Sequence, residues 1–346
     1  MQLPHLSSRQ KWLLATSVGA ALIIYKSVSS MKSPYASTSS ALPKLKPNFP
    51  TFRNIPFKEV NGTTLRLDIY KPLSSNSRRV VPTLVFIHGG SWVTASKNNI
   101  RKTFRQYALQ KLINNGCAVV SIDYRLADPT RFHMPDQISD CKDALKWLTV
   151  HGEEYGLDTS NIGVWGSSAG GHLAMMTVYT DNDMYPGDSS LAHIVPKVNY
   201  LIDTFGPTDL NTLFRTNINP VLLAIGKIWV HKVIAKRNGQ IKSVTGFDID
   251  RQKDRVRALC REYSPINYVT EDSCPTLIMH GTADKTVKFQ QSVNLLRRLR
   301  RCKVDSKLIK FNGLRHSFSN ATPTEAKDVA QHILDFVRLN YQISKE

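Results

Sequence analysis

The sequence predicts an α/β fold with a mainly parallel central sheet and helices on both of its faces. Three observations indicate this fold. Short apolar runs, such as residues 83–88, are typical of fully buried strands. Longer stretches with apolar residues at helical spacing separate these runs, and Gly or Pro bounds most of them. Strands that alternate with helices along a chain form βαβ units, whose strands run parallel.

The elements follow in chain order, starting with a hairpin. Asn61-Gly62 supplies the positive φ angles of a two-residue turn, so residues 57–60 and 63–70 are expected to pair as antiparallel strands. Further strands are expected at residues 83–88, 117–122, 161–166, 198–205, 276–280 and 307–311, and helices at residues 100–115, 136–155, 169–180, 288–301 and 324–341.

A long interruption, residues 209–262, separates two of the expected strands. It is too long and too apolar for a simple connection. Residues 220–235 are expected to form one or two helices, so the insertion is interpreted as a helical lid over the carboxyl-terminal edge of the sheet. Two readings of this lid stay open: a cap packed on a cleft, or a basic interfacial surface that meets lipid.

Composition places the chain among globular proteins. Hydrophobic residues make up 41% of its 346 residues, which excludes wholesale disorder, collagen and a polytopic membrane protein. The formal net charge of +19 favours anionic surfaces. The arginine cluster at residues 297–301 lies on an expected amphipathic helix without a recognition motif, so it is interpreted as a solvated face and no nucleic-acid partner is expected.

Residues 1–50 predict a signal or membrane-anchor segment plus a linker. Residues 12–25 carry no charge, a length that fits the apolar region of a signal peptide, whereas a bilayer span needs about 20 residues. Because Ser27-Val-Ser29 is a poor cleavage site, an uncleaved anchor stays open, as does a surface helix. Residues 31–50 are interpreted as the linker. We therefore expect an exported or membrane-anchored protein whose globular domain spans residues 51–346.

The five cysteines do not predict a metal site. No C-x-x-C pair occurs among them, so a structural zinc site is not expected. They are interpreted as small buried hydrophobes, although a Cys260–Cys274 disulfide stays open for an exported protein. No metal or organic cofactor is expected.

The strongest chemical motif is Gly166-Ser-Ser-Ala-Gly170, which matches G-x-S-x-G. An expected buried strand ends at Gly166 and a helix opens at Ala169. Such a strand–turn–helix holds its central serine, Ser168, exposed above the sheet in a strained turn. The N–H of Ala169, at the helix N-terminus, is placed to stabilise a developing negative charge.

Glycines follow another expected strand, in His88-Gly-Gly-Ser-Trp92. Their backbone N–H groups can be aimed at an oxyanion, so Gly89 and Gly90 are the candidate donors. His88 itself is interpreted as structural.

An acid and a base complete the set. Asp284 follows the strand expected at 276–280, and His316 follows the strand expected at 307–311. The order Ser, Asp, His matches a nucleophile–acid–base arrangement in which the acid orients an imidazole. Asp203 and Asp209 are the rival acids.

Together with Asp123-Tyr-Arg125, these motifs resemble the α/β-hydrolase superfamily over roughly residues 55–341. The resemblance is closest to the carboxylesterase branch, near hormone-sensitive-lipase-like and feruloyl-esterase-like enzymes. It implies that Ser168 is the nucleophile, His316 the base and Asp284 the acid. It also implies a structural role for the Asp-Tyr-Arg motif and oxyanion contacts from the three named N–H groups.

The resemblance implies a serine hydrolase that cleaves a small or medium acyl ester through an acyl-enzyme. The donor loop reads H-G-G-S-W instead of the H-G-G-G common in the lipase-like branch, and this form also appears in the kynurenine formamidase and prenylcysteine methylesterase branches. An amide hydrolase of formamidase or peptidase type therefore stays open. So does a catalytically silent binding protein of the same fold.

Overall fold

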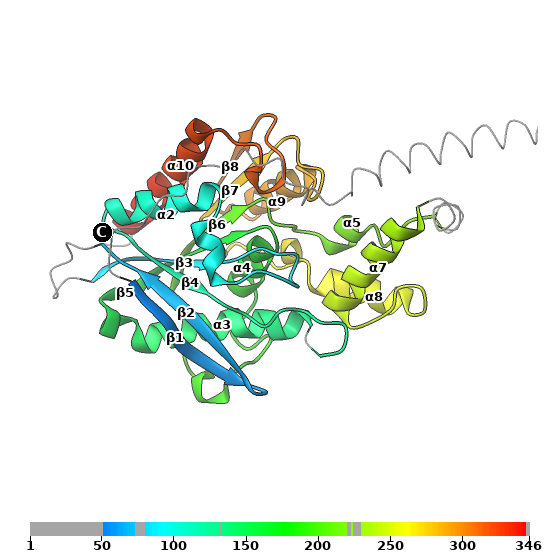
Figure 1. Cartoon of the computed structure of the whole chain (residues 1–346), viewed down its shortest axis with the longest axis horizontal. Coiled ribbons are helices and arrows are strands. Elements are labelled where there is room, and N and C mark those ends of the chain that lie inside the picture. The colour runs from blue at the N-terminus through cyan, green and yellow to red at the C-terminus, as the bar shows by residue number, and fades with distance from the viewer. Residues whose placement is uncertain (1–50, 73–79, 132, 220–222, 224–229, 344–346) are drawn as a thin grey trace, which may run out of the picture.

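A computed structural model describes residues 51–72, 80–131, 133–219, 223 and 230–343. An eight-stranded sheet with the order β1-β2-β4-β3-β5-β6-β7-β8 forms its centre (Figure 1). The first two pairings, β1 with β2 and β2 with β4, are antiparallel, and all the others are parallel. The strands are β1 (Thr51–Val60), β2 (Thr63–Tyr70), β3 (Val81–Ile87), β4 (Ala118–Ile122), β5 (Leu157–Ser167), β6 (Val198–Thr204), β7 (Thr276–Gly281) and β8 (Ser306–Phe311).

Helices cover both faces of this sheet, as the sequence predicts. The longer ones are α2 (Phe104–Asn114), α3 (Met134–His151), α4 (Ala169–Tyr179), α9 (Gln290–Arg301) and α10 (Pro323–Ile343). Alternation along β3 shows how the two faces are built. Leu84 and Phe86 join the core under α2 and α10, whereas Val85 and Ile87 join the core under α3, α4 and α9.

The hairpin turn forms where the sequence predicts it. Asn61 and Gly62 both have positive φ, at 49° and 71°, and Val60 pairs with Thr63. The first strand is longer than expected, because β1 begins at Thr51. Its pairing with β2 shifts register between Phe52 and Ile55, which hides the strand from a simple alternation pattern.

The insertion contains α5 (Leu210–Phe214), α7 (His231–Thr245) and α8 (Lys253–Glu262), which lie together at one end of the molecule in Figure 1. Of the helix expected at 220–235, residues 220–222 and 224–229 lie outside the described residues. The end at 235 is wrong, since α7 continues to Thr245. Ile234, Ile241 and Val244 are buried and keep helical spacing past Gly239.

The insertion is joined to the carboxyl-terminal edge of the sheet. It follows β6 directly, and its last turn returns to α4, where the carbonyl of Tyr263 lies 2.7 Å from Nε2 of His172. Phe214 of α5 packs near Trp92, with ring centroids 6.2 Å apart. The insertion therefore contacts the loop that follows β3.

Two further expectations concern membranes and disulfides. Within the described ranges, no helix has the length and apolar character needed to cross a bilayer. The expected signal or anchor segment, residues 1–50, lies outside those ranges. The Cys260–Cys274 disulfide is not formed, because all five cysteines are free. Cys260 is instead fully buried in the apolar core.

Candidate active site

Ser168 sits at a sharp turn between β5 and α4. Its backbone has φ 57° and ψ −122°, a strained conformation for a residue with a side chain. A hydrogen bond to the neighbouring strand stabilises the turn, since the Ser168 N–H donates to the carbonyl of Thr204 on β6 at 2.8 Å. Only glycine fits at position 170, where a Cβ would collide with the carbonyl oxygen of Ile87. The strand and helix thus hold the Ser168 side chain partly exposed at the carboxyl-terminal edge of the sheet.

The structure brings the three expected site residues into one hydrogen-bonded chain. Ser168 Oγ lies 2.9 Å from Nε2 of His316, and Nδ1 of His316 lies 2.7 Å from Oδ2 of Asp284. Asp284 follows β7 and His316 follows β8, so adjacent parallel strands deliver them to the same edge. The His316 side chain is 11% exposed, whereas that of Asp284 is fully buried.

The protonation state of this chain follows from its partners. A carboxylate accepts but does not donate, so Nδ1 of His316 carries the proton and Nε2 presents a lone pair to the Ser168 hydroxyl. Burial would raise the pKa of Asp284, but electrostatic attraction and hydrogen bonding to His316 and His280 outweigh it. They hold the pKa of this carboxyl well below its ordinary value. Asp284 is therefore ionised at neutral pH.

A second histidine, His280, also contacts Asp284, and the sequence did not predict this contact. Nε2 of His280 lies 3.2 Å from Oδ2 of Asp284 and 3.0 Å from the carbonyl of Val287. Both are acceptors, so this nitrogen carries the proton, and Nδ1 accepts from the Ser292 hydroxyl at 2.7 Å. Both side chains are fully buried. The spacing of His280 four residues before Asp284 is the one sequence signal for this contact.

Asp284 is further fixed by backbone donors. Its Oδ1 accepts from the N–H groups of Thr286 and Val287 at 2.8 and 3.0 Å. Four hydrogen bonds, two at each oxygen, thus hold the carboxylate in place.

Of the three candidate oxyanion donors, Gly89 lies beside Ser168 and Ala169 follows it in the chain. A Cβ at Gly89 would come within 2.7 Å of the Ser167 carbonyl oxygen and 3.3 Å of the Ser168 Cβ, so the backbone of Gly89 runs directly along the turn. Gly90 has φ 122°, a conformation that favours glycine, and its carbonyl accepts from the N–H of Thr94. Ala169 is the first residue of α4, where N–H groups have no partner within the helix.

His88 has the structural role that the sequence predicts. It is fully buried, and its ring stacks on Tyr124 with centroids 4.2 Å apart. Burial lowers the pKa of His88 to about 4, so it is neutral at physiological pH.

The rival acids have other contacts. Asp203 Oδ1 accepts from the N–H of Gly206 at 2.9 Å, and burial raises the pKa of Asp203 to about 7. Asp209 accepts from the Thr212 N–H and caps α5. Of the three candidates, only Asp284 is hydrogen-bonded to His316.

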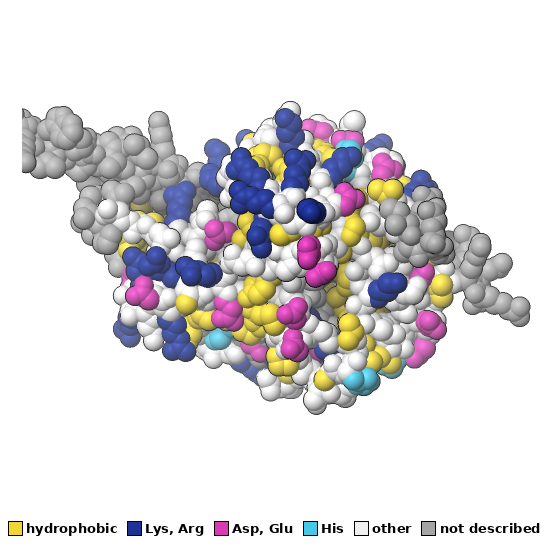
Figure 2. All heavy atoms as spheres, turned by 180° about the vertical axis from the view of Figure 1, so that it is seen from behind, with side chains coloured by type: hydrophobic (Ala, Val, Ile, Leu, Met, Phe, Trp, Pro, Cys, Tyr) yellow, Lys and Arg dark blue, Asp and Glu magenta, His cyan; other side chains and the backbone are white. Residues whose placement is uncertain are grey.

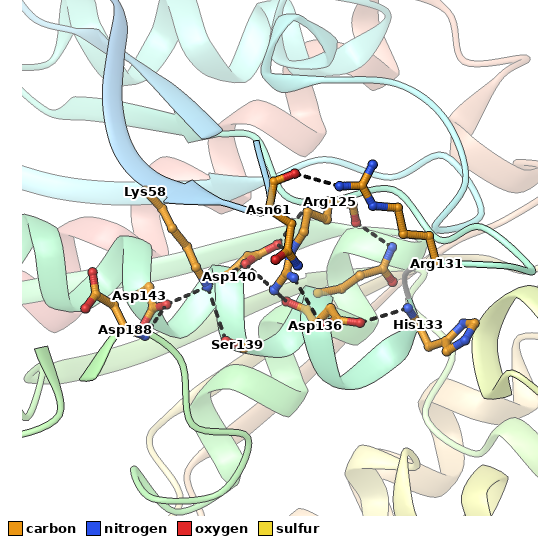
Figure 3. A network of polar contacts seen from close by, with 11 residues as sticks. Lys58, Asn61, Arg125, Arg131, His133, Asp136, Ser139, Asp140, Asp143 and Asp188 are labelled. Carbon is orange, nitrogen blue, oxygen red and sulfur yellow. Dashed lines mark hydrogen bonds and ion pairs between the residues drawn. The ribbon is translucent and has the colours of Figure 1, made fainter. Parts of the chain in front are cut away.

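Arg125, of the Asp-Tyr-Arg motif, belongs to a buried polar network on α3 (Figure 3). Its guanidinium donates two hydrogen bonds to Asp140, both at 2.8 Å, and pairs with Asp136 at 3.0 Å. Lys58 of β1 lies between Asp140 and Asp143, at 2.7 and 2.6 Å. Every ionic group of this network is paired, which ties β1 to α3 and fits a structural role.

The described part of the chain holds no group of three or more His, Cys, Asp or Glu side chains arranged to bind a metal ion. The chemistry available at Ser168 is that of a hydroxyl beside a neutral imidazole, itself oriented by a carboxylate. Such an arrangement suits transfer of an acyl group to the hydroxyl.

Comparisons with known proteins agree with this architecture. The chain is 29% identical over 221 residues to esterase LipC of Mycobacterium tuberculosis, an alignment that covers 63% of this chain and 48% of that protein. It is 27% identical over 241 residues to the probable carboxylic ester hydrolase LipM of the same organism, with 69% and 49% covered. The matches thus span about half the length of these curated relatives.

A solved structure shares the fold at low sequence identity. It is a truncated carbohydrate esterase from gut microbiota, with a TM-score of 0.65 and 22% identity, covering 89% of this chain and all of that one. The model of the BD-FAE family matches residues 67–299, which include Ser168 and Asp284 and end before His316. Since this match extends over more than half of the sequence, the chain belongs to the BD-FAE family of α/β-hydrolases.

Proposed function

We propose that the chain is a serine hydrolase that cleaves carboxylic esters of small or medium acyl groups through an acyl-enzyme. The observation that carries this proposal is the hydrogen-bonded chain from Ser168 through His316 to Asp284, with Ser168 held in a strained turn. The relatives named as esterases support the reaction class.

In the first half of the proposed reaction, Ser168 Oγ attacks the ester carbonyl carbon. Its proton passes to Nε2 of His316, which lies 2.9 Å away. The ring then carries a positive charge 2.7 Å from the Asp284 carboxylate, which stabilises it. The protonated His316 next delivers its proton to the leaving alcohol as the carbon–oxygen bond breaks.

The carbonyl oxygen becomes negatively charged during this attack. In the proposal, backbone N–H groups of Gly89, Gly90 and Ala169 donate to it. Such preorganised donors typically supply about 3 kcal/mol each to transition-state stabilisation. In the second half, His316 takes a proton from water as the water oxygen attacks the acyl carbon. The bond from this carbon to Ser168 Oγ then breaks as His316 returns the proton to Oγ, which releases the carboxylic acid and restores both residues.

Amide hydrolysis is the second candidate function. The donor loop H-G-G-S-W supports it, because this form of the loop also appears in formamidase branches of the superfamily. The same proton transfers would serve an N-formyl or aminoacyl amide. A catalytically silent binding protein is the third candidate. The three functions differ in turnover. An ester hydrolase cleaves esters with a higher kcat/KM than matched amides, which is the result we expect. An amide hydrolase shows the reverse order, and a silent protein cleaves neither.

The test is a set of p-nitrophenyl esters of increasing acyl length, measured beside N-formyl and aminoacyl amides. We expect turnover to be highest with short or medium acyl chains. Ser168→Ala should lower kcat by several orders of magnitude, whereas Ser167→Ala, which removes the neighbouring hydroxyl, should retain activity. Thermal unfolding checks that the wild type and Ser168→Ala are both folded. Equal ester turnover by the two folded proteins would refute the proposal.

We also propose that residues 1–50 place the protein in an exported or membrane-anchored state, and that this segment or the insertion contacts membrane. The uncharged residues 12–25, flanked by lysine and arginine, support this. Cell fractionation followed by N-terminal sequencing tests it. Recovery of the protein with an intact N-terminus in the soluble cytosolic fraction, and none in carbonate-washed membranes, would contradict both export and membrane anchoring.

A further inference from the structure

The C-terminal half of α9 presents an unusually dense group of cations. Residues 290–303 contain four arginines and one lysine, and no aspartate or glutamate. Leu295 and Leu299 bury the opposite side of the helix in the core. Seen from behind, lysine and arginine side chains gather on the upper part of the molecule, where α9 lies (Figure 2).

Four polar residues of α9 share one stripe along the helix. Asn294, Arg297, Arg298 and Arg301 follow the i, i+3, i+4, i+7 spacing, so their side chains lie one above another. The stripe borders a hollow of about 520 Å³, whose other wall is formed by Ile266 and Asn267. The guanidinium of Arg298 is fixed within it, since it donates to the carbonyl of Val269 at 2.8 Å.

Two of the arginines in this hollow, Arg297 and Arg301, lack a side-chain partner for an ion pair or hydrogen bond in the described part of the chain. Like charges four residues apart destabilise a helix. Cations near a helix C-terminus are favoured by the helix dipole, but that effect depends on position along the axis and not on the face. It does not account for the alignment of three arginines toward one hollow.

Guanidinium groups and side-chain amides match the geometry of phosphate oxygens, which accept from several donors at once. We propose that this arginine hollow of α9 binds the phosphate headgroups of an anionic membrane surface. A membrane is favoured over a single small anion because the stripe from Asn294 to Arg301 extends about 10 Å along the helix axis, farther than one phosphate group reaches. The proposal is independent of the ester hydrolysis proposed above.

The test is flotation of the full chain with vesicles of phosphatidylcholine alone and of phosphatidylcholine mixed with phosphatidylserine. We expect tighter binding to the anionic vesicles, weakened by salt. Arg297→Gln and Arg301→Gln should each weaken it by roughly fivefold, since one basic residue near such a surface contributes that factor. Arg300→Gln is the matched control: it removes an exposed arginine from the same last turn but outside the hollow.

Three outcomes would overturn the proposal. One is equal binding to neutral and anionic vesicles, as expected if residues 1–50 alone hold the protein there. Another is an equal loss in Arg300→Gln and Arg301→Gln, which would mean general charge attraction. The last is binding of inorganic phosphate in solution without any preference for anionic vesicles, which would indicate a site for a free anion.

Discussion

Replacing Asp284 by asparagine tests the proposed mechanism through a change of only one non-hydrogen atom. The native carboxylate uses both oxygens as acceptors: Oδ1 from two backbone N–H groups, and Oδ2 from His280 and His316. An asparagine must place its NH₂ group at one of these two positions. At the Oδ1 position it would face two backbone N–H groups, which can only donate. At the Oδ2 position His316 can move its proton to the other ring nitrogen and accept, so this position is favoured.

The amide N–H would then face Nδ1 of His316 and favour the tautomer protonated on Nε2. That nitrogen could no longer accept the proton of Ser168, from which it is 2.9 Å away. Loss of the correct tautomer costs about 10⁴ in kcat in serine hydrolases of this type, or roughly 5.5 kcal/mol. We therefore expect a fall in kcat of this size for Asp284→Asn at neutral pH, with KM little changed.

The assay is steady-state hydrolysis of the best p-nitrophenyl ester, with folding checked by thermal unfolding. Asp203→Asn is the matched control, because Asp203 is a buried carboxylate on the neighbouring strand β6 and a rival candidate for the acid. It should retain most of the activity. Asp284→Asn within tenfold of wild type, or a larger loss in Asp203→Asn, would refute the reasoning.

Three further substitutions test other contacts. Gly89→Ala should lower kcat about 10²-fold or more, because its Cβ would lie 2.7 Å from the Ser167 carbonyl and displace a donor; unchanged steady-state kinetics would contradict this. Ser292→Ala should lower kcat by about fivefold, the value of the one hydrogen bond that holds His280 beside Asp284. A loss of stability with kcat unchanged would leave Ser292 purely structural. Lys58→Met should lower the free energy of unfolding in urea by about 3–5 kcal/mol, since it leaves Asp143 buried without its cation; a loss below 1 kcal/mol would contradict a paired network.

Much of the fold could be predicted because its signals are local. The apolar runs of the parallel strands, the Asn61-Gly62 turn and the glycines of the serine turn each fix a conformation through their own residues. The start of β1 was missed because its register shift breaks the alternation. The end of α7 was misplaced because Gly239 and its polar neighbours interrupt a burial pattern that continues on the hidden face.

The site could be predicted to the same extent and for the same reason. Ser168, Asp284 and His316 each follow a recognisable strand, and parallel strands deliver their carboxyl ends to one edge. Ser292 could not be found in this way. Its contact with His280 depends on which face of α9 packs against β7, and that rotation is set by the core and not by a motif.

Labelling with a fluorophosphonate, followed by peptide mass spectrometry, measures the central claim most directly. The probe forms a covalent bond only with a serine hydroxyl that a neighbouring base has activated. We predict one stoichiometric adduct on Ser168, lost in His316→Ala. An unlabelled protein, or an adduct on another serine while Ser168 stays free, would contradict the assignment of this residue as nucleophile.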